Sequence, residues 1–347
     1  MKILVDARPL HDPRPGGVTR VTDGLLRALP GQSTNAEYIL GTTGMRDPVT
    51  SIPLTHRLHT QIPNKAWSAG CLAGLCAFDA LAPQADRVFL PNIGFVGSLT
   101  KPYTLLVHDV AYWIEPRWFS PRARLWHIAT RARRTIERAQ HIVCLSARTA
   151  YDVKHVLGVD PSRLSIIQAG LHAQDMAPSA SPLPEALISR RFVLAFGAHD
   201  PRKNATCAVN AVRALRSMPA YADVQLVLVG SALPREPWIT PLAYPSRDEL
   251  RTLYAHAACV LYPSWYEGFG IPLHEASVFG TPCISSTAGA LPETAPPGTL
   301  FAPPQKPHLW TEALELLLSS SHTHRTTRVL GDWTAGAQQL ANILTSL

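Results

Sequence analysis

Short apolar runs alternate with longer amphipathic segments along nearly the whole chain. This alternation is typical of a parallel α/β architecture, because a helix usually carries the chain from one parallel strand to the next. The pattern predicts strands at 2–5, 103–107, 142–145, 164–167, 192–196, 224–230, 260–261 and 281–285. It predicts helices at 18–29, 147–157, 248–258, 272–279 and 307–319, and a final helix from Asp332 onward.

The chain is long enough for two domains. Its 347 residues would supply two domains of about 150–180 residues each. Residues 173–187 are rich in proline, serine and alanine, which is typical of a linker. We therefore expect an N-terminal domain over 1–172, a linker over 173–187 and a C-terminal domain over 188–332.

The composition is that of a globular protein in a reducing compartment. Hydrophobic residues make up 46% of the chain. The apolar run after Lys2 meets Asp6 at once and is too short for the apolar region of a signal peptide, so we expect a cytoplasmic protein. The six cysteines form no Cys-x-x-Cys pair, which predicts no structural zinc site. Cys144, Cys259 and Cys283 lie in apolar runs and are expected to be buried thiols. The apolar stretch 67–78 is shorter than the roughly 20 residues of a membrane span, so it predicts a buried or interfacial helix.

Positive charge is concentrated in one segment. The net charge is +7, and residues 117–138 hold seven arginines and one acid. Basic side chains recur at the spacing of one helix face, at 124, 127, 131, 134 and 138, beside an apolar stripe at 125, 128, 132, 136 and 139. Two interpretations stay open: a core helix with a solvated basic face, or a face that contacts anionic lipid headgroups on the inner side of the cytoplasmic membrane. Nucleic acid is not expected as a partner, because no binding motif accompanies the charge.

Two glutamates, Glu267 and Glu275, flank the segment Gly-Phe-Gly-Ile-Pro-Leu-His. The glycines leave backbone N–H groups uncovered, and Pro272 suits the first turn of a helix. Glu275 would then lie about one turn into the helix, with Glu267 in the loop before it. A helix N-terminus with bare amides favours an anion or a ring of hydroxyls. By itself, however, the same pattern also fits a solvent-exposed junction between a loop and a helix with no ligand.

Three further loops follow predicted strands, where open α/β sheets bind ligands. They contain Gly16 and Gly17, then His108 and Asp109, and then the turn 200–204 with its adjacent Arg202 and Lys203. The arginine and lysine of that turn could hold a diphosphate, although a surface basic pair is an equally simple interpretation. The sequence contains no Asp-x-Asp, so no metal held by that motif is predicted. A bound diphosphate would instead need cationic side chains and helix N-termini.

Taken with their surroundings, these segments resemble the large retaining glycosyltransferase family 4. The stretch from Glu267 to Glu275 is similar to its Glu-x7-Glu signature. The similarity to its donor domain continues over 253–254, 263–276, 280–282 and 291–293, with 196–204 similar to its phosphate-binding segment. Residues 108–112, 115–116 and 118–119 resemble the acceptor-domain signature of its mannosyltransferase-like branch.

The resemblance implies a GT-B fold, in which two Rossmann-like domains face each other across a cleft and a last helix, here 333–347, crosses back to the N-terminal domain. It also implies roles for the catalytic candidates. Arg202 and Lys203 would stabilise the diphosphate leaving group, Glu267 would hold donor-sugar hydroxyls, and His108 would lie near the reacting sugar.

The remaining candidates are donor-binding residues in this resemblance. Glu275 would bind the nucleotide ribose, and Tyr244 lies where the base usually packs. Gly16 and Gly17 would lie near the phosphate. The donor-sugar contacts would come from Phe269, Gly270 and Ile271.

The implied activity is retaining, metal-independent transfer of a hexose, with mannose from GDP-mannose as the expected donor. The acceptor would be a saccharide, free or lipid-linked, in bacterial-type surface polysaccharide synthesis, and no cofactor is expected. Alternatives are a UDP- or other NDP-sugar donor, a GT-B epimerase or phosphorylase, and a non-catalytic nucleotide-sugar-binding subunit. A dinucleotide-dependent dehydrogenase is disfavoured because the first loop lacks Gly-x-Gly-x-x-Gly.

Overall fold

The computed structural model describes residues 1–12, 16–32, 35–45, 52, 56–197, 200–230, 236–319 and 325–346. The chain forms two compact units. The N-terminal unit comprises Met1–Pro116, Ser120–Gly170 and Gly331–Leu347, and the second unit comprises Arg117–Phe119 and Leu171–Leu330. Residues 13–15 of the first glycine loop and Leu347 of the final helix lie outside the described residues.

The N-terminal unit is built on a seven-stranded parallel sheet of order β3-β2-β1-β4-β5-β6-β7. Its strands are β1 (Lys2–Asp6), β2 (Glu37–Thr43), β3 (His56–Thr60), β4 (Arg87–Leu90), β5 (Tyr103–Leu106), β6 (His141–Cys144) and β7 (Leu164–Ile166). Its helices are α1 (Gly17–Ala28), α2 (Asn64–Leu72), α3 (Ala111–Ile114), α4 (Pro121–Ala129), α5 (Ala132–Arg138), α6 (Ala147–Leu157) and α12 (Thr334–Ser346). The sequence pattern missed β2, β3 and β4.

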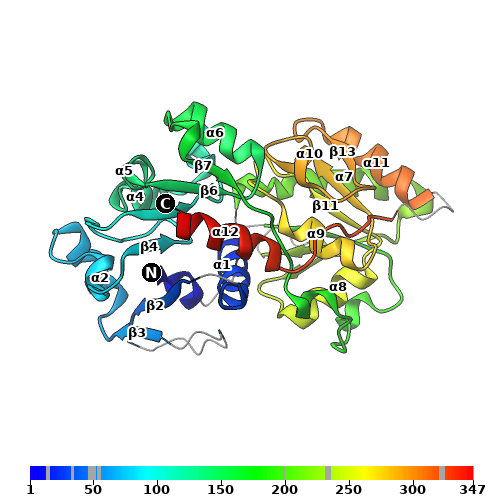
Figure 1. Cartoon of the computed structure of the whole chain (residues 1–347). Helices are drawn as coiled ribbons and strands as arrows, with labels where there is room; N and C mark the ends of the chain where they lie inside the picture. The colour runs from blue at the N-terminus through cyan, green and yellow to red at the C-terminus, as the bar shows by residue number, and fades with distance from the viewer. Residues whose placement is uncertain are drawn as a thin grey trace. The chain divides into compact units, whose positions relative to one another are not determined.

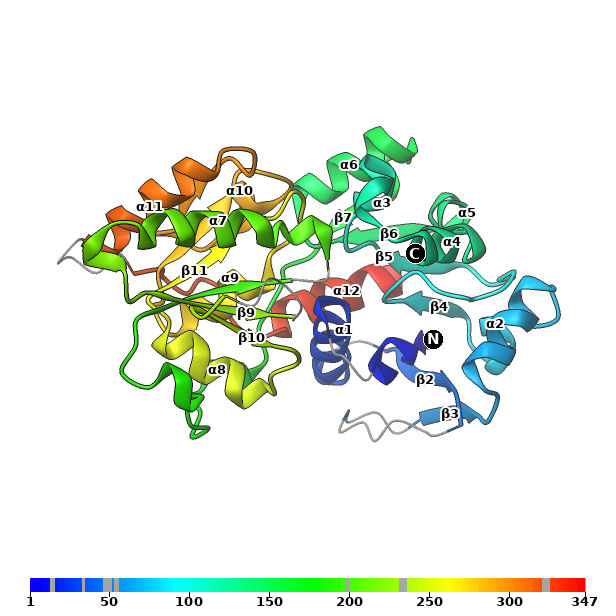
Figure 2. The ribbon, with the colours of Figure 1, turned by 180° about the vertical axis from the view of Figure 1, so that it is seen from behind.

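The final helix, α12, returns to the N-terminal unit as the fold expectation requires. It packs beside α1, and both views show the two helices adjacent (Figures 1 and 2). Leu340 and Leu344 on its buried face are fully buried. The last residues of the chain therefore complete the core of the unit formed by the first ones.

The second unit contains a six-stranded parallel sheet of order β10-β9-β8-β11-β12-β13. Its strands are β8 (Phe192–Phe196), β9 (Gln225–Val229), β10 (Ile239–Leu242), β11 (Cys259–Tyr262), β12 (Cys283–Ser286) and β13 (Leu300–Ala302). Its helices are α7 (Ala205–Arg216), α8 (Arg247–His256), α9 (Ile271–Val278), α10 (Leu291–Thr294) and α11 (Pro307–Ser319). This strand order, with the first strand central and the chain then switching sides, is that of the doubly wound Rossmann fold.

Alternation along β8 explains why this sheet is covered on both faces. Val193 and Ala195 face a core that includes α7 and α11, which lie side by side in Figure 2. Phe192 and Leu194 face the opposite core, which includes α8 and α9. A strand that is buried on both faces of a parallel sheet consists of consecutive apolar residues. This pattern is why the strand was predicted at its observed bounds.

The stretch expected as a linker, 173–187, lies within the second unit. Leu187 is 1% exposed and belongs to the core that includes α8. Thr252 Oγ1 on α8 donates a hydrogen bond to the Ser181 carbonyl at 2.9 Å. These contacts fix the stretch on the second unit.

The expected single basic helix over 117–138 is wrong. Ser120 Oγ accepts from the Ala123 amide at 3.2 Å and starts α4, which ends at Ala129. Arg131 then adopts a left-handed backbone with φ 52°, and α5 begins after it. Because the break rotates one half relative to the other, the predicted apolar stripe is divided: Leu125 and Ile128 are 65% and 66% exposed, whereas its second half is buried.

The expected apolar helix within 67–78 was partly right. Helix α2 covers only Asn64–Leu72, and Leu75 beyond it is 83% exposed. The predicted buried thiols are confirmed, since Cys144, Cys259 and Cys283 are all buried.

Candidate active site

Lys203 and Glu267 meet at the carboxyl edge of the second unit's sheet. Lys203 follows β8 and Glu267 follows β11, neighbouring strands at the point where the strand order reverses. Open α/β sheets bind ligands at this switch point. Lys203 Nζ donates to Glu267 Oε1 at 2.6 Å and to Tyr262 Oη at 2.8 Å. Two residues predicted from separate motifs thus form one ion pair, here called the Lys203–Glu267 pair.

The Lys203–Glu267 pair is largely shielded from water, with the two side chains 21% and 13% exposed. Burial lowers the pKa of Lys203, but the Glu267 carboxylate outweighs it and raises that pKa above its usual value. Burial and the Glu267 charge together raise the pKa of Tyr262, which stays neutral. An ammonium has three N–H groups, and two are used here. The third can bind a further acceptor.

Two glycines allow this close packing. At Gly197, with φ +82°, a Cβ atom would lie 2.0 Å from Lys203 Cγ. At Gly289, with φ +60°, a Cβ atom would lie 2.5 Å from the Glu267 carbonyl oxygen. The neighbouring Ala290 amide donates to that carbonyl at 2.8 Å. Sequence reasoning missed Gly289, because its requirement arises only when the loops after β11 and β12 meet.

Arg202 lies in the same turn as Lys203 but pairs with a different carboxylate, that of Asp200. Asp200 Oδ1 accepts from the Arg202 amide at 3.0 Å, and Asp200 Oδ2 pairs with the Arg202 guanidinium at 2.8 Å. Burial opposes ionisation of Asp200, yet Arg202 brings the pKa of Asp200 below its usual value. The formal charges of these two pairs sum to zero. An anion bound here would therefore need backbone N–H groups in addition to the two cations.

Helix α9 can supply such N–H groups. It begins after Gly270, whose φ is +97°, and no side chain caps its first turn. Its first residue is Ile271, one position before the start that the sequence pattern predicts. Glu275 lies one turn into this helix, where its side chain is 3% exposed. Tyr254 Oη on α8 donates to Glu275 Oε2 at 2.8 Å, a partner that the sequence pattern did not indicate.

Phe269 covers one side of α9. Its ring stacks on His274, with ring centroids 5.0 Å apart, and His274 is 1% exposed. Burial lowers the pKa of His274 from 6.5 to about 4. Near neutral pH this histidine is uncharged and packs as an aromatic side chain.

We expect the change His274→Leu to reduce the acid sensitivity of folding. The folded-state pKa lies below the unfolded one, so the unfolded chain binds a proton first and stability falls as pH drops from about 6.5 toward about 4. Between pH 7 and pH 5 the loss would be about 2 kcal/mol. Urea unfolding of both proteins at the two pH values measures it. If the free energy of unfolding fell equally with pH in the wild type and in His274→Leu, His274 would contribute nothing to acid sensitivity.

Tyr244, the candidate for base packing, follows β10 and is 59% exposed. Its ring is therefore accessible to a ligand at the same carboxyl edge that carries the Lys203–Glu267 pair.

The remaining candidates belong to the N-terminal unit. His108 follows β5, and its Nε2 lies 2.8 Å from the Pro91 carbonyl oxygen after β4. Because a carbonyl only accepts, Nε2 carries the proton and Nδ1 keeps a lone pair. Burial lowers the pKa of His108, which favours this neutral form. His108 can therefore accept a hydrogen bond from a hydroxyl group.

Gly16 and Gly17 stand at the start of α1. A Cβ atom at either position would meet nothing within 4 Å, and no side chain caps this helix. Among the described residues, no side chain therefore caps the first turn of α1, where an anion would be favoured.

The described parts of the chain contain neither a cluster of metal ligands nor a helix that could cross a membrane. In those parts, no three histidine, cysteine, aspartate or glutamate side chains gather closely enough to hold a metal ion. No helix described there combines the length and hydropathy that a bilayer crossing requires.

Comparisons with known proteins find a family match within the second unit. Residues 190–320 match the family model described as Glycosyl transferases group 1. An MMP alpha-(1->4)-mannosyltransferase of Mycolicibacterium hassiacum is 30% identical over 193 residues, covering 52% of this chain and 45% of the relative. The O-antigen chain mannosyltransferase B of Escherichia coli is 26% identical over 244 residues, covering 65% of this chain and 63% of the relative. Both matches thus span less than two thirds of the relatives' own length.

The solved structures show the same architecture. A sucrose-phosphate synthase from Thermosynechococcus elongatus superposes with a TM-score of 0.72 at 20% identity, covering 99% of this chain and 98% of that chain. At this identity the likeness shows the fold, and it confirms the expected pair of Rossmann-like α/β domains. The family match falls on the unit that holds the Lys203–Glu267 pair. Residues 190–320 of this chain are thus similar to the glycosyl transferases group 1 family.

Proposed function

We propose that the chain is a retaining, metal-independent hexosyltransferase that moves mannose from GDP-mannose to a saccharide acceptor. The Lys203–Glu267 pair at the switch point carries this proposal, because it places a shielded cation and a hydroxyl-binding carboxylate 2.6 Å apart. The names of the mannosyltransferase relatives support the choice of sugar. A UDP-sugar or another NDP-sugar is the alternative donor.

In this proposal, the bond from the anomeric carbon to the diphosphate breaks and negative charge grows on the leaving oxygen. Lys203 Nζ stabilises that charge through its remaining N–H, together with Arg202 and the N-terminus of α9. The leaving phosphate takes the proton of the acceptor hydroxyl, whose oxygen bonds to the same face of the sugar. The protein contributes positioning and charge stabilisation.

The other site residues have binding roles in this proposal. Glu267 and the amides of Phe269 and Gly270 hold the donor sugar, and Glu275 accepts from the ribose hydroxyls. His108 Nδ1 accepts from a hydroxyl of the sugar.

The change Glu275→Gln should weaken GDP binding by about tenfold or more, because a hydrogen bond to a charged acceptor contributes about 1.5–3 kcal/mol. Calorimetric titration with GDP measures the dissociation constant. The matched control is Glu312→Gln on the exposed side of α11, which should bind GDP as the wild type does. Equal affinities in all three proteins would remove Glu275 from the nucleotide site.

We also propose that the acceptor is presented at an anionic membrane surface. Helix α4 supports this, since Leu125, Trp126 and Ile128 are 65%, 37% and 66% exposed and are interleaved with basic residues. Such a mixed apolar and basic face suits lipid headgroups. Co-sedimentation that does not depend on anionic lipid in the vesicles would count against this surface.

A further inference from the structure

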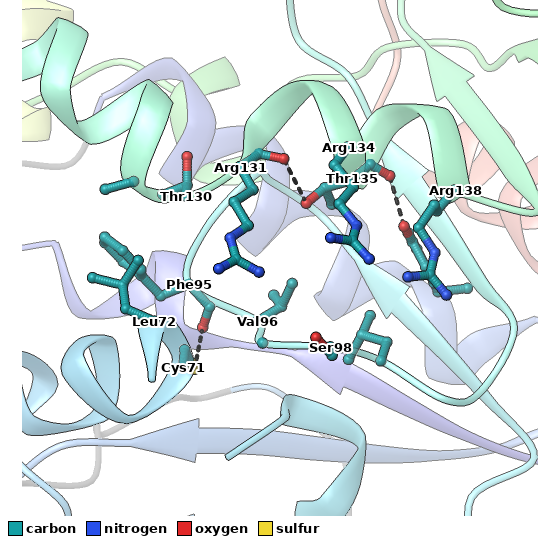
Figure 3. Close-up of a pocket in the computed structure, with 14 residues that line it drawn as sticks. Cys71, Leu72, Phe95, Val96, Ser98, Thr130, Arg131, Arg134, Thr135 and Arg138 are labelled. Carbon is teal, nitrogen blue, oxygen red and sulfur yellow. Dashed lines mark hydrogen bonds between the residues drawn. The ribbon is translucent and has the colours of Figure 1, made fainter. Parts of the chain in front are cut away.

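An open pocket lies in the N-terminal unit, outside the candidate catalytic and donor-binding residues considered above. It is bounded by α5, the end of α2 and the loop between β4 and β5 (Figure 3). Fourteen residues line it: Cys71, Leu72, Phe95, Val96, Gly97, Ser98, Leu99, Tyr103, Ala129, Thr130, Arg131, Arg134, Thr135 and Arg138. None of them is acidic.

Three arginines form one wall of this pocket. Arg131, Arg134 and Arg138 recur at a spacing of three and four residues, and Figure 3 shows their guanidinium groups on one side of the helix, directed toward the loop with Phe95 and Val96. Within the described residues, none of the three forms an ion pair, whereas Arg133 on the same helix pairs with Glu137 at 2.7 Å. The pocket therefore gathers three positive charges without compensation.

The helix that presents these arginines is fixed in place. Tyr103 Oη donates to the Thr135 carbonyl at 2.7 Å from the start of β5. Arg163 donates to the Glu137 carbonyl at 2.9 Å, at the end of α5. The left-handed residue Arg131 turns the chain between α4 and α5 and brings its own side chain into the row. An L-residue rarely adopts this conformation, so the break that orients Arg131 is held by its surroundings.

The opposite wall carries apolar side chains beside the Ser98 hydroxyl. Leu72, Phe95, Val96 and Leu99 line it, so the pocket places carbon atoms opposite guanidinium groups. Guanidinium groups bind the paired oxygens of phosphate well, since they donate two parallel hydrogen bonds. Of the simple anions, an organic phosphate matches both walls, because its oxygens would meet the arginines and its carbon chain would meet the apolar side chains.

We propose that this pocket binds an organic phosphate, with Arg131, Arg134 and Arg138 on the phosphate and the Phe95–Leu99 loop on its apolar part. The site is distinct from the candidate catalytic His108. Tyr103 begins β5 and His108 lies two residues beyond its last residue, Leu106, so the two positions are at opposite ends of a strand about 10 Å long. The phosphate can come from a free ester or from a lipid headgroup, which share this chemistry.

The double change Arg134→Gln and Arg138→Gln tests the proposal, with Arg133→Gln as the matched control on the same helix outside the pocket. The probes are dodecyl phosphate below its micellar concentration, inorganic phosphate, and phosphatidylcholine vesicles with and without phosphatidate. Calorimetry and co-sedimentation report binding of the full chain, and thermal unfolding verifies that each variant is folded.

We expect the wild type and Arg133→Gln to bind dodecyl phosphate with equal affinity, more tightly than inorganic phosphate, and the double variant to bind it at least tenfold more weakly. Binding to phosphatidate vesicles that is lost in the double variant assigns the phosphate to a lipid. Binding to the soluble ester alone assigns it to a free ester. If the double variant bound dodecyl phosphate as tightly as the wild type, or if Arg133→Gln lost as much affinity as the double variant, the proposed phosphate site would be wrong. Neither result affects the nucleotide site, since all three proteins retain Lys203, Glu267 and Glu275.

Discussion

Replacing Lys203 by methionine should lower kcat/KM for sugar transfer by at least about 100-fold, the effect typical of losing one charge-stabilising donor. Lys203 Nζ is 2.6 Å from Glu267 Oε1 and mostly shielded, so its charge acts in a medium of low dielectric constant. If the leaving diphosphate gains charge in the transition state, the loss should appear mainly in kcat. Lys306→Met, at an exposed position of the same unit, should leave the rate unchanged.

The same change also breaks a buried ion pair, and this effect must be separated from catalysis. Removing one partner of such a pair costs about 3–5 kcal/mol, because the other charge remains buried and unpaired. The double variant Lys203→Met with Glu267→Gln should recover much of that stability without recovering activity. An unchanged kcat/KM in a folded Lys203→Met protein would exclude the leaving-group role.

The change Gly289→Ala should destabilise the protein by about 3 kcal/mol, more than a left-handed residue costs by itself. The new Cβ would lie 2.5 Å from the Glu267 carbonyl oxygen and 2.7 Å from its amide nitrogen, so backbone atoms would have to move. Because Glu267 moves with them, donor binding should weaken as well. Urea unfolding gives the free energy of unfolding, and titration with nucleotide sugar gives the affinity.

Gly158→Ala is the matched control for this prediction. Gly158 has a φ of +72°, close to that of Gly289, but a Cβ atom added there would meet nothing within 4 Å. Gly158→Ala should lower the free energy of unfolding by about 1 kcal/mol, the cost of the backbone conformation alone. An equal loss at both positions would show that contact with Glu267 does not restrict residue 289.

Much of the fold follows from local pattern. The strand Phe192–Phe196 and the helices Ala147–Leu157 and Pro307–Ser319 have the bounds that their apolar runs and periodicities predict. Edge strands such as His56–Thr60 were missed because only part of their surface is buried, which leaves a weak apolar signal. The break at Arg131 interrupts a periodicity that continues through it, so no sequence signal marked it.

The candidate site, like the fold, is predicted only in part by local sequence. The motifs around Lys203 and Glu267 identify both residues, but their contact joins positions 64 apart and depends on β8 lying next to β11. The Tyr254 bond to Glu275 likewise depends on the packing of α8 against α9. Local sequence can thus nominate charged and glycine-rich loops, whereas their partners are decided by the strand order.

The central claim is that the Lys203–Glu267 pair and Glu275 form a nucleotide-sugar site, and a thermal-shift panel tests it most directly. GDP-mannose, UDP-glucose and other nucleotide sugars are added to the wild type, the Lys203→Met, Glu267→Gln double variant and Glu275→Gln, since a ligand of the folded state raises Tm. We predict that GDP-mannose raises the Tm of the wild type most and that both variants lose most of this shift. No shift with any nucleotide sugar, or the same shift in all three proteins, would contradict the claim.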